Sequence, residues 1–211
     1  MCERPRPDPQ SMPVALCTRV RALGHDDWRK LVQLVKFMAA TKDDVLTLSM
    51  GEITALHNWV DASFAVHPDC KSHGGLVSIM KGGKGAILSG LEKQKLNTDS
   101  GTVAELAGTH QFSWRIVSAV VFLECQGHKA QENVLHQDNK SAILLEKNGC
   151  TSVSKRTRAV NVRHFQIKDY TDEKQLEIKC CRTDDMIGDY VTKRLQGYEF
   201  SKFRKAIMGM E

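Results

Sequence analysis

The sequence predicts an α/β fold in which a mixed central sheet is flanked by helices, with a helical extension at the N-terminus. Residues 134–138 (VLHQD) form a short apolar run that leads directly into the helical pattern SAILLEK. Residues 56–66 alternate between two faces, which is typical of a strand, and two more short strands follow. Strands thus occur both in series and in alternation with helices, which predicts a mixed sheet.

Composition limits the classes of protein to consider. The chain has 211 residues, 41% hydrophobic and 26% charged, which suits one globular domain with a real core. We expect no membrane span, because no stretch approaches about 20 apolar residues, and no secretory signal, because the N-terminus lacks an apolar segment. The net charge of +5 permits a polyanionic partner. Seven cysteines without a CxxC pair indicate free thiols in a reducing compartment, without a zinc site.

The first 54 residues divide into two parts. Residues 1–13 carry four prolines in a short polar stretch and are expected to form a disordered arm. Behind Asp26 and Asp27, which suit a helix N-terminus, apolar side chains recur at helical spacing: Trp28, Leu31, Val32, Val35 and Met38. We expect an amphipathic helix that needs a partner surface, and an ordinary core helix is the simplest interpretation.

The strand at residues 56–66 carries an acid in its middle. Alternation places Val60 and Ala62 on one face, and Trp59 and Asp61 on the other. An acid is unfavourable in mid-strand on propensity alone, so Asp61 lies on an exposed sheet face or is kept for chemistry. Strands at residues 76–80 and 85–89 follow, joined through KGGKG, which we interpret as a hairpin turn.

Residues 98–125 are expected to be mostly helical. One stripe of this helix is most simply core, and it contains Trp114, Val117, Ser118, Val121, Phe122 and Cys125. At its start, Thr102 and Glu105 have the spacing of a capping box. That role competes with metal binding, because a carboxylate folded back on the N-cap cannot readily hold an ion.

The strand predicted at residues 134–138 ends in Asp138. Carboxylates at strand ends of α/β folds usually face the ligand crevice. Either Asp138 or Asn139 could instead cap the helix that follows. Taken alone, Asp138 would therefore be weak support for catalysis.

The remainder of the chain adds a basic run, a strand and two helices. The basic run contains Lys155, Arg156, Arg158 and Arg163, and it is either a solvated charge run or a contact for backbone phosphates. A strand is expected at residues 176–181. In the short helix after it, capped near Asp184, we expect Asp189 to lie beside Asp185, one turn earlier. Residues 196–211 form an amphipathic helix that packs on the core.

Four acids now lie on separate elements of one sheet: Asp61, Glu105, Asp138 and Asp189. Two-metal phosphodiester chemistry requires such a set, because two Mg²⁺ ions about 4 Å apart are held by shared carboxylate oxygens. Without ions the clustered acids would repel one another.

Several stretches resemble a known family. They are WVDASFAVHPDCKSHGG, KGAILS, TVAEL, HQDNKSAILLEKNG, SKRTR, MIGDYVTKRLQG and FSKFRKAIMG, and they cover roughly residues 17–209. Together they resemble the C-terminal part of the pol polyprotein of copia-type LTR retrotransposons, where an RNase H domain follows the end of the reverse transcriptase. The resemblance implies a remnant of the reverse transcriptase connection at residues 14–54 and an RNase H-like domain at residues 55–195.

The resemblance also implies a function. We expect an endonuclease that cleaves the RNA strand of RNA–DNA hybrids with two Mg²⁺ ions, or with Mn²⁺ as an alternative ion. The catalytic metal ligands would be Asp61, Glu105, Asp138 and Asp189. Lys155, Arg156 and Arg158 would contact backbone phosphates. The expected partners are the hybrid and the missing reverse transcriptase portion, in cytoplasmic virus-like particles of an active element, with no membrane. The YxDD-type motif of the polymerase itself is absent, so DNA synthesis by this chain is not expected.

Departures from the family pattern motivate an alternative. Gly101 and Val103 replace a serine and a glutamate, Ala159 replaces a histidine, and Arg194 replaces a proline. Gly188 replaces an alanine and adds helix-destabilising freedom of roughly 1 kcal/mol. The alternative is a catalytically inactive relic that keeps the fold and at most binds nucleic acid. A transposase or integrase of the same broad fold fits less well, because those enzymes generally use three acids.

Overall fold

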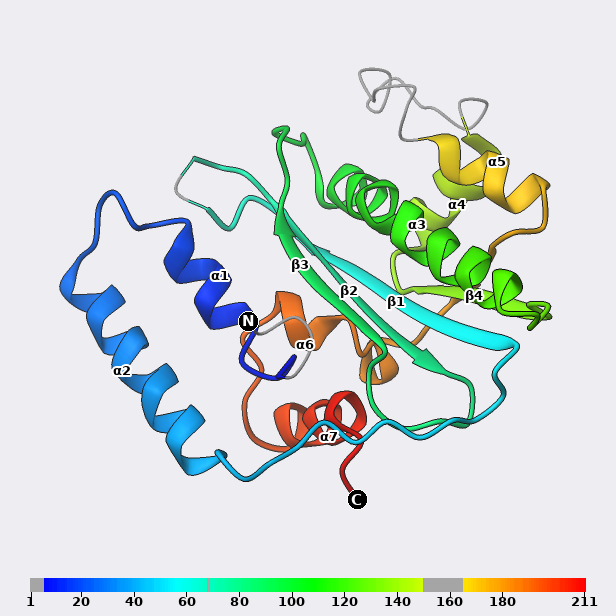
Figure 1. The fold of residues 1–211 in the computed structure, drawn as a ribbon. Helices are drawn as coiled ribbons and strands as arrows, with labels where there is room; N and C mark the ends of the chain where they lie inside the picture. The colour runs from blue at the N-terminus through cyan, green and yellow to red at the C-terminus, as the bar shows by residue number, and fades with distance from the viewer. Residues whose placement is uncertain (1–5, 68, 150–164) are drawn as a thin grey trace.

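A mixed five-stranded sheet forms the centre of the molecule (Figure 1). The computed structural model describes residues 6–67, 69–149 and 165–211. The strands are β1 (Ala55–Ser63), β2 (His73–Met80), β3 (Leu88–Lys93), β4 (Glu132–Gln137) and β5 (Glu177–Cys180), in the order β3-β2-β1-β4-β5. β1, β2 and β3 are antiparallel neighbours, whereas β4 runs parallel to both β1 and β5. The mixed sheet expected from the sequence is confirmed.

Strand ends differ from expectation in two places. The hairpin between β2 and β3 is present, but β3 begins at Leu88 and continues to Lys93 instead of occupying residues 85–89. β1 ends at Ser63, and Phe64 and Val66 are exposed beyond it. The alternating pattern therefore identified the strand but extended it past its last sheet partner, His73.

Helices cover both faces of the sheet (Figure 1). One face packs on α3 (Gly101–Cys125), α4 (Lys140–Asn148) and α5 (Gln166–Asp172), around a core that includes Val60, Leu106 and Phe112. The other face packs on α6 (Asp189–Thr192) and α7 (Gly197–Met208), which follow the 3₁₀ turn η3 (Thr183–Asp185). The single short helix expected around Asp189 is thus two separate turns. Helix α7 packs on the core as expected, through Phe203 and Ile207.

The buried face of α3 is not the one the sequence pattern suggested. Trp114, Val121 and Phe122 are exposed, whereas Phe112 and Ile116 are fully buried. The N-terminal half of α3 lies on the sheet, and Gly74 and Gly90 leave space there for the Phe112 ring. The apolar stripe in the C-terminal half lacks such a surface among the described residues, so periodicity alone selected the wrong face.

The N-terminal helices lie beside the α6–α7 side of the sheet (Figure 1). They are α1 (Ser11–Cys17) and α2 (His25–Ala40). The helix expected behind Asp26 is confirmed as α2, but the expectation of a core helix is wrong: Trp28 and Val35 are more than half exposed. The buried side of α2 holds Asp27 and Leu34 instead. Among the described residues, no helix has both the length and the apolar character needed to cross a membrane.

Residues 6–13 also differ from the expected disordered arm. Asp8 is buried, and its carboxylate pairs with Arg6 at 2.8 Å and with Arg204 of α7 at 2.9 Å. The hydroxyl of Tyr190 donates to the Asp8 carbonyl at 3.0 Å. These contacts hold the segment against α6 and α7, because a buried carboxylate needs its charge partners. Proline content alone could not reveal them.

Candidate active site

Two of the predicted acids lie at adjoining ends of parallel strands. Trp59 of β1 pairs in register with His136 of β4. Asp61 and Asp138 follow these partners by two residues each, so both lie on the same face at the carboxyl edge of the sheet. Asp61 is only 1% exposed, which excludes the exposed sheet-face interpretation. Asn139, and not Asp138, caps α4, because its side chain accepts hydrogen bonds from Ser141 N and Ala142 N.

Glu105 does not take part in a capping box. Ser100 is the N-cap of α3 and accepts a hydrogen bond from the N–H of Val103, where Thr102 was the expected cap. Glu105 lies one turn further on, on the buried face of α3, and is 7% exposed. Its carboxylate is therefore free of the competing role that the sequence suggested. Carboxylate oxygens of Asp61, Glu105 and Asp138 all lie within 4.8 Å of one another.

Asp189 lies near this cluster, because Lys193 contacts both Asp189 and Asp61, but it is not among the three acids whose oxygens lie within 4.8 Å of one another. It is the first residue of α6 and is 4% exposed. Asp185, by contrast, is exposed, and its carboxylate pairs with Lys202 at 3.1 Å. The single helix that would have placed Asp185 beside Asp189 is absent, because η3 ends at Asp185 and α6 begins at Asp189; Asp185 is exposed, whereas Asp189 is buried.

Gly188 allows the close approach of α6 to Asp61. A Cβ atom at position 188 would lie 3.2 Å from the Cβ of Asp61 and 3.4 Å from the carbonyl oxygen of Trp59. The residue precedes α6, so it is not inside a helix that it could destabilise. The expected loosening effect of Gly188 is replaced by a packing role.

Residues after Asp189 supply the charge partners of the acids. Lys193 Nζ lies 2.7 Å from Asp189 Oδ1 and 3.5 Å from Asp61 Oδ1. The hydroxyl of Thr192 donates a short hydrogen bond to Asp61 Oδ2. Sequence reasoning assigned no role to Thr192 or Lys193, although the i, i+4 spacing of Asp189 and Lys193 is a recognised signal for an ion pair.

The electrostatics of the cluster disfavour full ionisation. Burial, together with the charges of Asp61 and Asp138, raises the pKa of Glu105 to about 9. Burial and the charge of Asp61 likewise raise the pKa of Asp189 to about 7, although Lys193 opposes the shift. Burial, followed by the charge of Asp61, also raises the pKa of Asp138. The carboxylates therefore repel one another in a partly dry site.

The donor set fits a hard divalent cation. Mg²⁺ prefers oxygen ligands at about 2.1 Å, so two ligands on opposite sides of one ion lie about 4.2 Å apart. The oxygens of Asp61, Glu105 and Asp138 lie no more than 4.8 Å from one another, so one cation could contact all three after a small adjustment. A bound cation would also remove the repulsion that raises the pKa values of Glu105 and Asp189.

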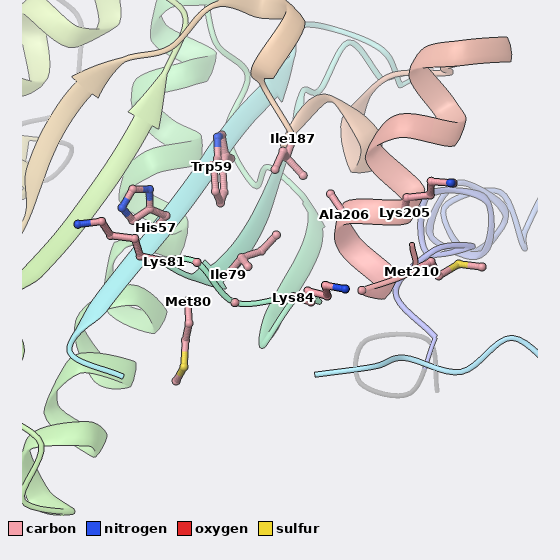
Figure 2. Close-up of a pocket in the computed structure, with 13 residues that line it drawn as sticks. His57, Trp59, Ile79, Met80, Lys81, Lys84, Ile187, Lys205, Ala206 and Met210 are labelled. Atoms are coloured by element: carbon pink, nitrogen blue, oxygen red, sulfur yellow. The ribbon is translucent and has the colours of Figure 1, made fainter. Parts of the chain in front are cut away.

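The predicted phosphate contacts Lys155, Arg156 and Arg158 lie outside the described residues, as does Ala159. A separate groove of about 380 Å³ lies between the sheet and the end of α7 (Figure 2). Its lining includes Trp59, whose ring stacks on His136 with a centroid distance of 4.8 Å. The four acids do not line this groove.

The strand order, the two helical layers and the acid cluster at the sheet edge define an RNase H-like fold. A structure of the foamy viral protease-reverse transcriptase in complex with an RNA/DNA hybrid matches with a TM-score of 0.50 and 14% identity. The match covers 76% of this chain and 19% of that chain. The N-terminal RNase H domain of a Mycobacterium tuberculosis protein has a TM-score of 0.45 and 13% identity, covering 72% of this chain and 97% of that one.

The sequence comparison gives the particular relatives. The chain is 27% identical over 188 residues to the retrovirus-related Pol polyprotein from transposon TNT 1-94 of Nicotiana tabacum. It is 26% identical over 187 residues to the corresponding polyprotein from transposon RE2 of Arabidopsis thaliana. These matches cover 89% and 86% of this chain but only 14% and 12% of the polyproteins. No protein-family model matches. The resemblance to retrotransposon Pol polyproteins is thereby confirmed.

Proposed function

We propose that this chain is a ribonuclease H that cleaves the RNA strand of RNA–DNA hybrids, acting as part of a retrotransposon polyprotein. The observation that carries the proposal is the meeting of Asp61, Glu105 and Asp138 within 4.8 Å at the carboxyl edge of the sheet. The charges of Asp61 and Asp138 also act on Asp189 and raise its pKa. The RNase H-like fold and the retrotransposon relatives support the same class of activity.

In this proposal the four acids hold two Mg²⁺ ions, or Mn²⁺ in their place. Such ions supply an activated water and stabilise the leaving oxygen of the phosphodiester. Asp61 and Asp138 are presented by the rigid ends of two paired strands, so their spacing is fixed before an ion or substrate arrives. Lys193 neutralises Asp61 and Asp189 in part, which limits the repulsion when no ion is bound.

The proposed substrate is an RNA–DNA hybrid. Lys155, Arg156 and Arg158 would contact its backbone phosphates, and contacts to the 2′-hydroxyl groups would distinguish RNA from DNA. The reverse transcriptase of the polyprotein is a proposed partner, and virus-like particles in the cytoplasm are the proposed location. Phosphate contacts predict that hybrid affinity falls as the salt concentration rises.

The deciding experiment is cleavage of a labelled RNA–DNA hybrid in Mg²⁺ and in Mn²⁺. We expect wild-type protein to cut the RNA strand and Asp138→Asn to lose the activity. Asp185→Asn is the matched control, because Asp185 is an exposed acid outside the cluster, and we expect it to retain activity. A folded wild-type protein without cleavage in either ion would refute the proposal. Salt-dependent hybrid binding by that protein would instead favour the inactive relic.

A further inference from the structure

The turn from β4 into α4 contains a buried glutamine that touches both of its acidic neighbours. Gln137 is the last residue of β4 and is 0% exposed. Its carbonyl oxygen Oε1 accepts hydrogen bonds from the backbone N–H of Asp138 at 2.9 Å and of Asn139 at 3.2 Å. Its amide nitrogen Nε2 donates to Glu105 Oε2 at 3.5 Å.

These contacts provide acceptors for the backbone N–H groups that have no strand partner where β4 ends. The Gln137 carbonyl still accepts a ladder bond from Cys181 N, at 2.9 Å. The next two N–H groups leave the sheet before the first turn of α4, and a buried N–H without an acceptor costs free energy. The Gln137 side chain provides one acceptor for both groups. The backbone that carries the Asp138 carboxylate is thereby tied to a fixed point.

A second buried acid lies behind the glutamine. Glu146 of α4 is 0% exposed, and its interactions are with Thr109 of α3 and with Gln137, although neither carboxyl oxygen makes a well-formed hydrogen bond. The Gln137 amide thus donates to Glu105 and influences the nearby Glu146, while its carbonyl oxygen accepts from the backbone. An amide has two acceptor sites and two N–H donors, so one side chain can serve all of these neighbours at once.

We propose that Gln137 is the positioning residue that sets the distance between the Glu105 and Asp138 carboxylates, and thereby the affinity of the acid cluster for divalent ions. The inference rests on the proposed function, because it takes Glu105 and Asp138 to be metal ligands. Glu105 is on α3 and Asp138 follows β4, and the Gln137 side chain joins the carboxylate of Glu105 to the backbone N–H of Asp138. Groups that orient metal ligands in this way typically contribute 10–100-fold to metal affinity.

The test is the dissociation constant for Mg²⁺ and for Mn²⁺, measured by calorimetry on the whole chain. Gln137→Met keeps the size of the side chain but removes both the acceptor and the donors, and we expect binding to weaken by about 10–100-fold. Gln137→Asn keeps a buried amide but shortens it by one methylene, so it cannot span from the turn to Glu105. We expect Gln137→Asn to weaken binding as well, and it decides the question if Gln137→Met does not fold.

The matched control is Asn133→Leu. Asn133 is a buried amide on the same strand, with hydrogen bonds to Asn58 and to the Gln175 carbonyl but not to the acids. Its loss should lower thermal stability without changing ion affinity by more than about twofold, which separates positioning from general stabilisation. Folded Gln137 variants that bind ions as tightly as wild type would overturn the positioning role while leaving the proposed function intact. Wild-type protein that binds neither ion would overturn both. Ion binding without hybrid cleavage would overturn the proposed function alone.

Discussion

The acids at the two ends of the β1–β4 strand pair have opposite electrostatic surroundings. At the amino-terminal end, Glu132 begins β4 opposite Ala55, and Lys81 and Lys179 lie 2.7 Å and 3.3 Å from its carboxylate. Hydrogen bonds from these lysines, chiefly from Lys81, lower the pKa of Glu132 to about 2, although burial opposes the shift. Side chains of the same chain thus neutralise the Glu132 carboxylate.

At the carboxyl end, the acids have fewer cations of their own. Lys193 contacts Asp61 and Asp189, whereas within the described residues the Glu105 carboxylate accepts a hydrogen bond only from the Gln137 amide, at 3.5 Å. Burial and mutual repulsion raise the pKa of Glu105 to about 9. The difference teaches that an acid count alone does not identify a metal site. Buried carboxylates with few internal cations are instead the acids whose charge a bound cation would neutralise.

The largest expected effect is on hybrid cleavage, and it appears when one acid at each end is replaced in a separate variant. Asp61→Asn should reduce hybrid cleavage by at least about 100-fold, because it removes a direct ligand and not merely a group that orients one. Glu132→Gln should leave the rate within about twofold of wild type, because Glu132 belongs to the opposite end. Initial cleavage rates in saturating Mg²⁺ measure both. Equal losses in the two variants would break the comparison between the ends.

Added Mg²⁺ should raise the stability of the folded protein through the acids at the carboxyl end only. If the cluster binds Mg²⁺, an ion concentration of 100 times Kd adds about 2.7 kcal/mol to the free energy of unfolding. For a chain of this size that raises Tm by roughly 5–11 °C. Glu105→Gln should lose most of this rise, whereas Glu132→Gln should keep it. Thermal denaturation with and without Mg²⁺ gives the result, and an unchanged rise in Glu105→Gln would exclude Glu105 as a ligand.

The metal-free protein should weaken as pH rises. Because the folded-state pKa of Glu105 is about 9 against an ordinary 4.5, protonation of this group favours the folded state. Its contribution is complete below about pH 4.5, decreases above it and is lost as the pH passes about 9. Asp189, with a pKa of about 7, acts in the same direction. Urea denaturation in EDTA from pH 5 to 9 should therefore show falling stability.

Glu105→Gln is the check on that slope, because it removes the titrating group and keeps its shape. The variant should be more stable than wild type at pH 9 by several kcal/mol, and the difference should shrink as the pH falls toward 5. Identical slopes for the two proteins would show that Glu105 ionises normally.

The smallest effect should come from the opposite end at low pH. The folded-state pKa of Glu132 is about 2, below its ordinary 4.5, so its contribution is present above about pH 4.5 and is lost as the pH falls through about 2. Since the carboxylate is 25% exposed, solvent limits the contribution to no more than about 1 kcal/mol. Glu132→Gln should remove this part of the acid-induced loss. Acid titration followed by circular dichroism measures it, and an unchanged curve would mean that the lysine pairs contribute nothing.

Much of the site could be predicted from the sequence. Alternation located β1 around Asp61, and the apolar run before Asp138 located β4, because a strand has a side-chain period that depends only on local geometry. The assignment of Glu105 and Asp189 depended on their motifs. Neither residue has a local pattern that distinguishes a ligand from a cap or a surface acid, and the capping-box spacing of Glu105 pointed to the wrong role.

The tertiary structure decided what the helices bury and which groups serve the acids. Periodicity defines a helical stripe, but the burial of that stripe depends on the surface opposite to it. Trp28 on α2 and Trp114 on α3 are therefore exposed despite their helical spacing. Asp8 is buried although it lies in a proline-rich segment, because Arg204, almost two hundred residues later, comes to lie against it. The role of Gln137 is of the same kind. Its oxygen serves neighbours in the chain, but its amide reaches Glu105, 32 residues away in sequence, and only the packing of α3 on the sheet brings the two together.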